Sequence, residues 1–405
     1  AIKVLTSTEG SEEQRQKVIG EARRTAALGD RCIVTVYGVI EHQGNAAIVM
    51  ELVDGGTLRD DGTPMREDAL FRIASMTKPV TSIAFMQLVE QCKVALEDPV
   101  SRVLPEFEGL GSYAGGGGDL PFAPTKPGQP MRFVDLLSHM SGLTYGFQNR
   151  TSVDAAYRKA RLDLSRGAIT SDEYIATLAK IPLEFEPGTR WNYSVATDVL
   201  GVCVERISGM RLGDYFREHI FAPLGMEDTG FDIDPAKQDR LTDAYAYRPG
   251  KPARLIDKGA ESRLMEPASF HSGGGGLVSS AADYHRFARM LLRGGELDGH
   301  RLLSAETVAA MRTNQLPGGS DLAALSSAMF SEADYQAVGF GLGFAMGLEG
   351  GEYYWGGVFS TYFWIDPVER LIGIFMTQLL PSSAYPIRAQ LREGVAQAIM
   401  QSRRG

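Results

Sequence analysis

The sequence is poor in the residues that build disulfide networks and metal sites. Its 405 residues include only three cysteines and six histidines. The cysteines, Cys32, Cys92 and Cys203, are odd in number and far apart, which argues against a disulfide framework and against a Cys-x-x-Cys motif. No His-Glu-x-x-His pair occurs. We therefore expect neither a metal nor another cofactor.

Excess positive charge and long apolar runs are also lacking. Lys and Arg number 41 against 50 Asp and Glu, a net charge of −9, which is the wrong sign for a protein that grips phosphate backbones. No apolar stretch approaches the roughly 18 residues that span a bilayer, and the N-terminus has no signal-peptide core. We expect no nucleic-acid partner, no membrane association and a cytoplasmic location. A leader removed before Ala1 is also compatible with the sequence. The oligomeric state stays open.

The composition is that of a protein with a substantial hydrophobic core. The chain is 44% hydrophobic and 22% charged, close to the average of globular proteins. This excludes disordered and fibrous classes. The length corresponds to two or three domains, or to one large fold with an insertion.

Apolar patterns divide the chain into two kinds of region. Glu9–Leu28 has the spaced apolar positions of a helix, and two strand-like runs, Cys32–Ile40 and Ala46–Val53, follow it. Phe71–Leu96 is apolar on most sides, which predicts a helix buried in the middle of the fold. From residue 98 to 267, helical patterns alternate with Gly- and Pro-rich loops, which indicates an inserted, mainly helical domain.

Strand patterns return in the last third of the chain. Helices are predicted over Ala281–Arg293 and from Ile387 to Met400. The strand-like runs between them are Val338–Leu348, Glu352–Trp355, Thr361–Ile365 and Leu371–Gln378. Strands near both ends predict an α/β fold, with one antiparallel sheet built from both termini and flanked by helices. The first domain would then combine residues 1–97 and 268–405, and the second would span 98–267.

The sharpest chemical signal is a serine and a lysine three residues apart at the start of the buried helix. This spacing puts Ser75 and Lys78 on one face. Burying a charged lysine in an apolar helix costs free energy, so its presence there indicates a function. Lys78 can take or relay the serine proton. The tetrapeptide alone is weak evidence, because a capping serine beside a solvated lysine gives the same pattern.

Two further motifs are each ambiguous alone. Tyr193 lies in Arg190-Trp-Asn-Tyr-Ser-Val195, where its phenolate can act as a base or its ring can simply pack beside Trp191. Trp355, Gly356 and Gly357 lie in a strand pattern, where adjacent glycines fit a close ligand approach or a plain bulge.

Taken in order, the three motifs resemble one family. The sequence is similar to the family VIII carboxylesterases, which are esterase relatives of class C β-lactamases and penicillin-binding proteins, from about Thr63 to the C-terminal helix. Leu137-Ser-His-Met-Ser-Gly-Leu143 and the Gly273–Gly276 run, between the motifs, strengthen the resemblance. It implies a β-lactamase-like fold.

The resemblance also implies roles for individual residues. Ser75 would be acylated, with Lys78 and Tyr193 sharing the general-base work. The backbone N–H groups of Ser75 and Val358 would hold the oxyanion. Trp355, Gly356 and Gly357 would contact the substrate.

Two departures from the β-lactamase pattern favour esters over lactams. Val195 stands where β-lactamases have an asparagine, and Trp355-Gly-Gly replaces Lys-Thr-Gly, which occurs nowhere in the chain. The cationic and amide groups that grip the carboxylate and side chain of a β-lactam are therefore missing, so we expect weak or no β-lactamase activity.

Two other families are weighed against this one. The Gly-x-Ser-x-Gly motif of α/β-hydrolases is absent, and the segment around Ser141 is the most similar to it. Lys3, Glu21 and Ile48-Val-Met-Glu-Leu-Val53 resemble the start of a protein kinase, but no Gly-rich loop, His-Arg-Asp or Asp-Phe-Gly accompanies them. The register and origin of the first sixty residues stay open.

The expected function is hydrolysis of short-chain acyl esters through an acyl-Ser75 intermediate. The substrate is thus a small-molecule ester. Acyl transfer to an alcohol or amine on the same scaffold is the alternative, with Tyr145 and Phe147 as apolar walls of an acceptor pocket. A non-catalytic sensor or scaffold is a third hypothesis, which the buried lysine beside a serine disfavours.

Overall fold

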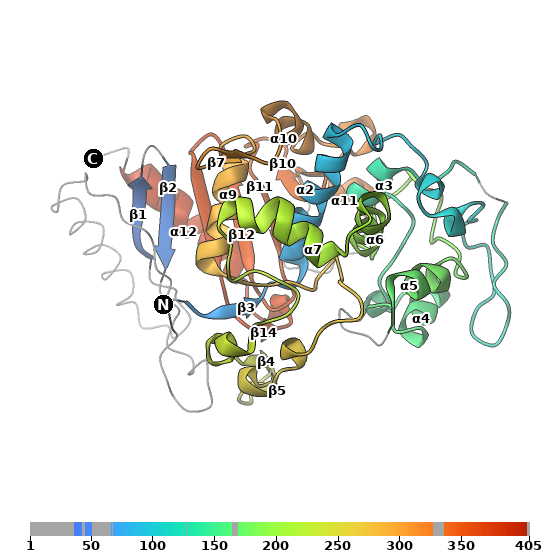
Figure 1. The fold of residues 1–405 in the computed structure, drawn as a ribbon, viewed down its shortest axis with the longest axis horizontal. Coiled ribbons are helices and arrows are strands. Elements are labelled where there is room, and N and C mark those ends of the chain that lie inside the picture. Colours follow the sequence, from blue (N-terminus) through green and yellow to red (C-terminus); the bar gives the residue numbers. More distant parts are fainter. Residues whose placement is uncertain are drawn as a thin grey trace.

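A seven-stranded sheet forms the centre of the protein (Figure 1). The computed structural model describes residues 36–42, 45–50, 66, 68–126, 128–163, 169–326 and 336–402. In the order of the sheet, the strands are β1 (Val36–His42), β2 (Asn45–Met50), β13 (Leu371–Phe375), β12 (Tyr362–Asp366), β11 (Tyr353–Gly356), β10 (Ala345–Gly347) and β9 (Val338–Phe340). The predicted helix Glu9–Leu28 and the kinase-like Lys3 and Glu21 lie outside the described residues.

The prediction of a sheet built from both ends of the chain is confirmed, with one correction. β1 and β2, which fall within the two strand-like runs near the N-terminus, form an antiparallel hairpin. β2 and β13, however, pair in parallel, so the sheet is mixed. These two strands come from opposite ends of the chain, and only a short hairpin connection forces an antiparallel direction. The run Val338–Leu348 is also two strands, because Gly343, with φ of +112°, lies in a turn between them.

The predicted central helix is shorter than its apolar pattern. Residues Leu70–Arg72 form strand β3, which pairs with β6 (Val278–Ser280), and a single 3-10 turn, η1 (Ala74–Met76), precedes helix α2 (Thr77–Glu90). The helix ends before Cys92, which has φ of +57°. Every residue of α2 from Thr77 to Leu88 is buried, so the prediction of a buried helix holds.

Helices cover both faces of the sheet. Tyr284 of α9 (Ala281–Leu292) packs on Phe363 of β12, with ring centroids 5.1 Å apart. Arg388 of α12 (Ile387–Ser402) lies over the ring of the neighbouring Tyr362, 5.5 Å from its centroid. Because consecutive strand residues point to opposite faces, α9 and α12 lie on opposite sides.

The middle of the chain is mainly helical, as its loops and patterns predict. Its helices are α3 (Phe133–Leu137), α4 (Ser152–Lys159), α5 (Ser171–Leu178), α6 (Ala196–Ser208), α7 (Leu212–Phe216) and α8 (Ala222–Leu224). Figure 1 shows helices α3 to α6 of this region to one side of the sheet. The division at residues 98 and 267 stays a prediction.

Smaller elements complete the fold. A three-stranded sheet joins β4 (Ala244–Ala246) and β5 (Arg254–Asp257) to β14 (Leu379–Leu380). The remaining strands and α-helices of the described residues are β7 (Glu296–Leu297), β8 (His300–Arg301), α10 (Ala305–Met311) and α11 (Leu322–Leu325). Among the described helices, none combines the length and apolar character of a membrane span.

Candidate active site

The serine of the first motif lies at the junction of two elements. Ser75 belongs to the 3-10 turn η1 and Lys78 to the first turn of α2, so the local fold puts both side chains on one side. Lys78 Nζ donates to Ser75 Oγ over 3.3 Å. The residue before the serine, Ala74, has φ of +43°, a conformation that L-residues rarely adopt. The turn therefore presents Ser75 in a constrained position.

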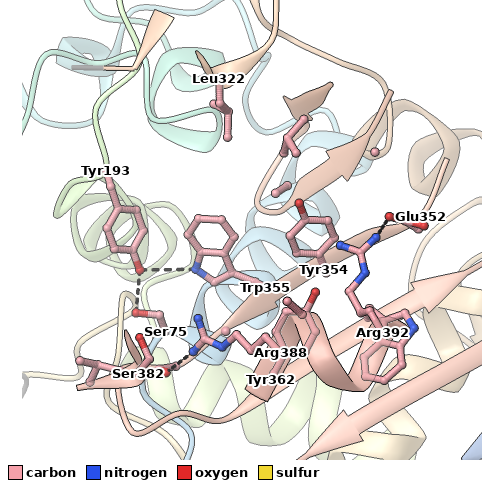
Figure 2. Close-up of a pocket in the computed structure, with 18 of the residues that line it drawn as sticks. Ser75, Tyr193, Leu322, Glu352, Tyr354, Trp355, Tyr362, Ser382, Arg388 and Arg392 are labelled. Atoms are coloured by element: carbon pink, nitrogen blue, oxygen red, sulfur yellow. Dashed lines mark hydrogen bonds and ion pairs between the residues drawn. The ribbon is translucent and has the colours of Figure 1, made fainter. Parts of the chain in front are cut away.

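Tyr193 reaches the same serine from the loop before α6. Its hydroxyl donates to Ser75 Oγ over 2.6 Å (Figure 2). Neighbouring backbone bonds fix this loop, since Asn192 N–H donates to His139 O and Val195 N–H donates to Thr144 O. The structure thus brings together the two sequence motifs that are 118 residues apart.

Lys78 is almost completely enclosed, with 1% of its surface exposed. Besides Ser75 Oγ, its Nζ donates to the hydroxyl of Tyr145 over 3.0 Å and to the carbonyl of Gly274 over 2.7 Å. An ammonium group has three donors, and these three acceptors match them. Nζ also lies 4.5 Å from the centroid of the Tyr193 ring, a favourable position for a cation.

The third motif packs closely against the backbone of the segment that precedes Ser75. A Cβ on Gly357 would lie 2.5 Å from the carbonyl oxygen of Ile73, so only glycine fits this approach. Trp355 Nε1 donates to the Tyr193 hydroxyl over 3.4 Å (Figure 2). Val358 follows the two glycines and lies, half exposed, on the cavity wall.

A cavity of about 1130 Å³ opens at the serine. The predicted residues that line it are Ser75, Tyr145, Phe147, Tyr193, Trp355, Gly356, Gly357 and Val358. Phe147 is half exposed and stacks on Tyr145, with ring centroids 4.8 Å apart. Ser141, in contrast, is fully buried and accepts a bond from the Leu143 N–H.

Comparison with known proteins agrees with this geometry. The beta-lactamase family model matches residues 27–397. The chain belongs to the beta-lactamase family. Esterase EstB of Burkholderia gladioli is 31% identical over 404 residues, covering 91% of this chain and 92% of the esterase. The resemblance to family VIII carboxylesterases is thereby confirmed.

Other members of the family and solved structures support the same fold. Protein Rv1367c of Mycobacterium tuberculosis is 39% identical, with 80% of each chain covered. The structure of EstCE1, a hydrolase with promiscuous acyltransferase activity, matches with a TM-score of 0.72 at 25% identity, covering 95% of this chain and 98% of that one. The simvastatin synthase LovD of Aspergillus terreus matches with a TM-score of 0.73 at 24% identity, covering 93% and 96%, which shows the shared fold.

Within this beta-lactamase-family site, Tyr145 has a contact that the sequence analysis missed. Its hydroxyl accepts a bond from Lys78, whereas the sequence suggested only an apolar wall. Burial, with a smaller contribution from the charge of Asp198, raises the pKa of the Tyr145 hydroxyl well above its usual value. Tyr145 therefore keeps its proton, and its oxygen accepts the hydrogen bond from Lys78. No sequence signal distinguishes this tyrosine from other loop aromatics.

His139, beside the site, is uncharged. Burial, together with the charge of Lys78, holds the pKa of His139 well below its usual value. Its Nδ1 lies 3.1 Å from Ser194 Oγ, and its ring meets that of Tyr193 edge-on at 5.0 Å. A neutral imidazole in this position packs against the tyrosine without adding a second positive charge beside Lys78.

Two arginines of α12 also line the cavity. Arg388 Nη2 donates to the carbonyls of Gly357 and Thr361, and so holds the turn that carries Val358. Arg392 forms an ion pair with Glu352 on the side of the cavity away from Ser75 (Figure 2). The spacing of these arginines in a C-terminal helix gave no sequence signal, because only the tertiary fold brings that helix to the third motif.

Proposed function

We propose that this chain is a carboxylesterase that hydrolyses short-chain acyl esters through an acyl-Ser75 intermediate. The observation that carries the proposal is the convergence of Lys78 Nζ and the Tyr193 hydroxyl on Ser75 Oγ inside a cavity. A serine with a hydrogen-bonded base is the usual arrangement of an activated nucleophile. The relatives named as esterases support a serine hydrolase on this scaffold.

The proposed reaction has two halves. The Tyr193 and Lys78 pair first gives up one proton. Ser75 Oγ then attacks the ester carbonyl while Tyr193, assisted by Lys78, takes the serine proton. The backbone N–H groups of Ser75 and Val358 stabilise the oxyanion. The C–O bond then breaks, and the alcohol leaves with the proton held by the base. A water molecule attacks the acyl carbon in the same way, releasing the acid and restoring Ser75.

A phosphonate probe is expected to label Ser75 alone. A fluorophosphonate forms a covalent bond only with an activated nucleophile, so one probe should bind per chain and block hydrolysis of p-nitrophenyl acetate. Intact-mass measurement followed by peptide mapping checks the stoichiometry and the position. An adduct on any other residue would contradict the proposed nucleophile. Stoichiometric acylation without turnover would instead favour the non-catalytic sensor.

Acyl transfer is a second candidate, supported by the size of the cavity. A volume of about 1130 Å³ exceeds what a short acyl group and a water molecule occupy, and Tyr145 and Phe147 form an aromatic wall beside the serine. Relatives on this scaffold include the acyltransferase calJ of Penicillium decumbens, 31% identical over 79% of this chain and 78% of its own.

Added alcohols distinguish the two candidates. If the cavity binds an acceptor, p-nitrophenyl butyrate with a saturable alcohol should yield butyrate ester in excess of the ratio set by alcohol and water concentrations. Chromatography of the products measures this ratio. If hydrolysis is the only reaction at every alcohol concentration, the acyltransferase hypothesis is excluded and the esterase hypothesis remains.

A further inference from the structure

Two acidic side chains lie together near the loops of Tyr145 and Tyr193, and neither has a part in the reaction proposed above. Asp154, in the first turn of α4, is fully buried. Glu184, in the segment that leads to Tyr193, is partly buried and within hydrogen-bonding reach of the Asp154 carboxyl. The hydroxyl of Thr151, the N-cap of α4, donates to Glu184 Oε1. Two carboxylates this close repel each other unless a proton joins them or a cation balances them.

Asp154 is bonded through both carboxylate oxygens to the loop before α4. Its Oδ1 accepts from the Thr144 hydroxyl over 2.7 Å, and its Oδ2 accepts from the backbone N–H of Arg150 over 2.8 Å. The Thr144 carbonyl in turn accepts from the N–H of Val195, two residues after Tyr193. One hydroxyl and one carbonyl therefore connect Asp154 to the loop that carries Tyr193.

The guanidinium of Arg150 makes a second connection to Tyr193. Its Nη2 donates to Asn192 Oδ1 over 2.9 Å and also to Gln148 Oε1. The side-chain amide of Gln148 donates to the Tyr193 carbonyl. On its other side, Arg150 Nε lies 3.9 Å from Asp154 Oδ2. A cation thus lies between the acidic pair and the residues that hold Tyr193, and its position depends on the charge of the pair.

The acidic pair binds a proton near neutral pH. Burial, together with the charge of Asp154, raises the pKa of the Glu184 carboxyl to about 7, although the charge of Arg150 lowers it. Tyr157 of α4 and Asp163, which follows that helix, also act electrostatically on the pair. Burial raises the pKa of both, so Tyr157 keeps its proton. The charge of the pair therefore changes in a pH range in which the tyrosine does not titrate.

We propose that Glu184 and Asp154 are positioning residues that share one proton and hold the Tyr193 loop through Arg150. The inference rests on the proposed esterase function and deepens it by naming what regulates the site. With the proton bound, the Glu184 O–H donates to an Asp154 oxygen, and Arg150 balances the one remaining negative charge. When the proton leaves to solvent, the two carboxylates repel each other and draw Arg150 away from Asn192. Tyr193 is then held less firmly.

The shared proton is tested by the stability of Glu184→Gln as a function of pH. The folded wild type keeps the Glu184 proton up to about pH 7, whereas an ordinary glutamate loses it near 4.5, so the wild type loses stability between these values. Glutamine keeps an N–H for Asp154 and never ionises. The thermal midpoint of the variant should therefore rise relative to the wild type across this range and stay higher above it, by on the order of 2 °C.

Glu173→Gln is the matched control. Glu173 also lies beside the capping threonine of a helix, Thr170 of α5, but it is exposed. Bonds from Thr170 lower the pKa of Glu173, so this carboxylate stabilises the fold once it is ionised. Its replacement should lower the thermal midpoint at neutral pH, the opposite direction to Glu184→Gln. The pH dependence of ester hydrolysis should not change.

The positioning role is tested with kcat/KM for p-nitrophenyl acetate. The ratio of Glu184→Gln to wild type should be near one in acid and rise through a midpoint near pH 7, by on the order of threefold, because only the wild-type pair gains a second charge. Arg150→Gln, which breaks the connection to Asn192, should lower kcat on the order of tenfold with KM little changed. In that background, Glu184→Gln should have no further pH-dependent effect.

Each readout can overturn the inference. A ratio that does not vary with pH, in a variant that the phosphonate still labels, would contradict the positioning role. A thermal-midpoint difference that is constant at every pH would contradict the shared proton. Where Glu184→Gln does not fold, Arg150→Gln replaces it: without the cation, the pKa of Glu184 should rise and the loss of stability should extend to higher pH, and an unchanged range would contradict the proposal. Failure of the esterase proposal looks different, since the wild type would lack Ser75-dependent hydrolysis while the thermal midpoints still followed the pair.

Discussion

Replacement of Ser75 with alanine is expected to abolish ester hydrolysis, with kcat/KM for p-nitrophenyl acetate falling on the order of 10⁴-fold or more. The substitution removes the oxygen on which Lys78 Nζ and the Tyr193 hydroxyl converge. Without it, neither proton transfer has a nucleophile to activate. Initial rates at saturating and limiting ester concentrations measure the loss, and the phosphonate adduct should disappear with it.

Ser141→Ala is the matched control for this variant. Both changes delete one hydroxyl, but Ser141 is fully buried and accepts a bond from its own turn. We expect hydrolysis and labelling to persist in Ser141→Ala when the variant is folded. Near-normal activity in Ser75→Ala, with circular dichroism unchanged in both variants, would show that another residue is the nucleophile.

The first motif could be found in the sequence because its geometry is local. Ser75 and Lys78 are three residues apart, and one helical turn is enough to bring their side chains together. Even so, the apolar pattern placed the helix start six residues too early, at Phe71 instead of Thr77. A buried strand and a buried helix look alike in a short apolar run, and β3 is such a strand.

The remainder of the site depends on contacts that no local pattern encodes. Tyr145, in a separate loop, accepts a bond from Lys78 Nζ, and Asp198, in α6, accepts one from the backbone N–H of Gly274. The resemblance to known esterases supplied Tyr193 and Trp355 but assigned Tyr145 only to a wall. The direction of β2 against β13 was missed for the same reason, since nearly the whole chain separates the two strands.

The strongest selectivity prediction is that this chain prefers esters to β-lactams. Trp355 stands where a lysine would bind the lactam carboxylate, and its indole N–H is directed to the Tyr193 hydroxyl. Loss of a charge-assisted hydrogen bond costs on the order of 1.5–3 kcal/mol. Val195, in place of an asparagine, is fully buried and supplies no amide, at a cost of roughly 0.5–1.5 kcal/mol.

An uncharged ester loses neither contact, whereas a β-lactam loses both. If both contacts act in the transition state, the deficit corresponds to a factor of about ten to a thousand. We therefore expect kcat/KM for a short-chain aryl ester to exceed that for nitrocefin by at least about one decade. Parallel initial-rate measurements on one enzyme preparation check the ratio. Nitrocefin turnover equal to or above that of the ester would overturn this interpretation of Trp355 and Val195.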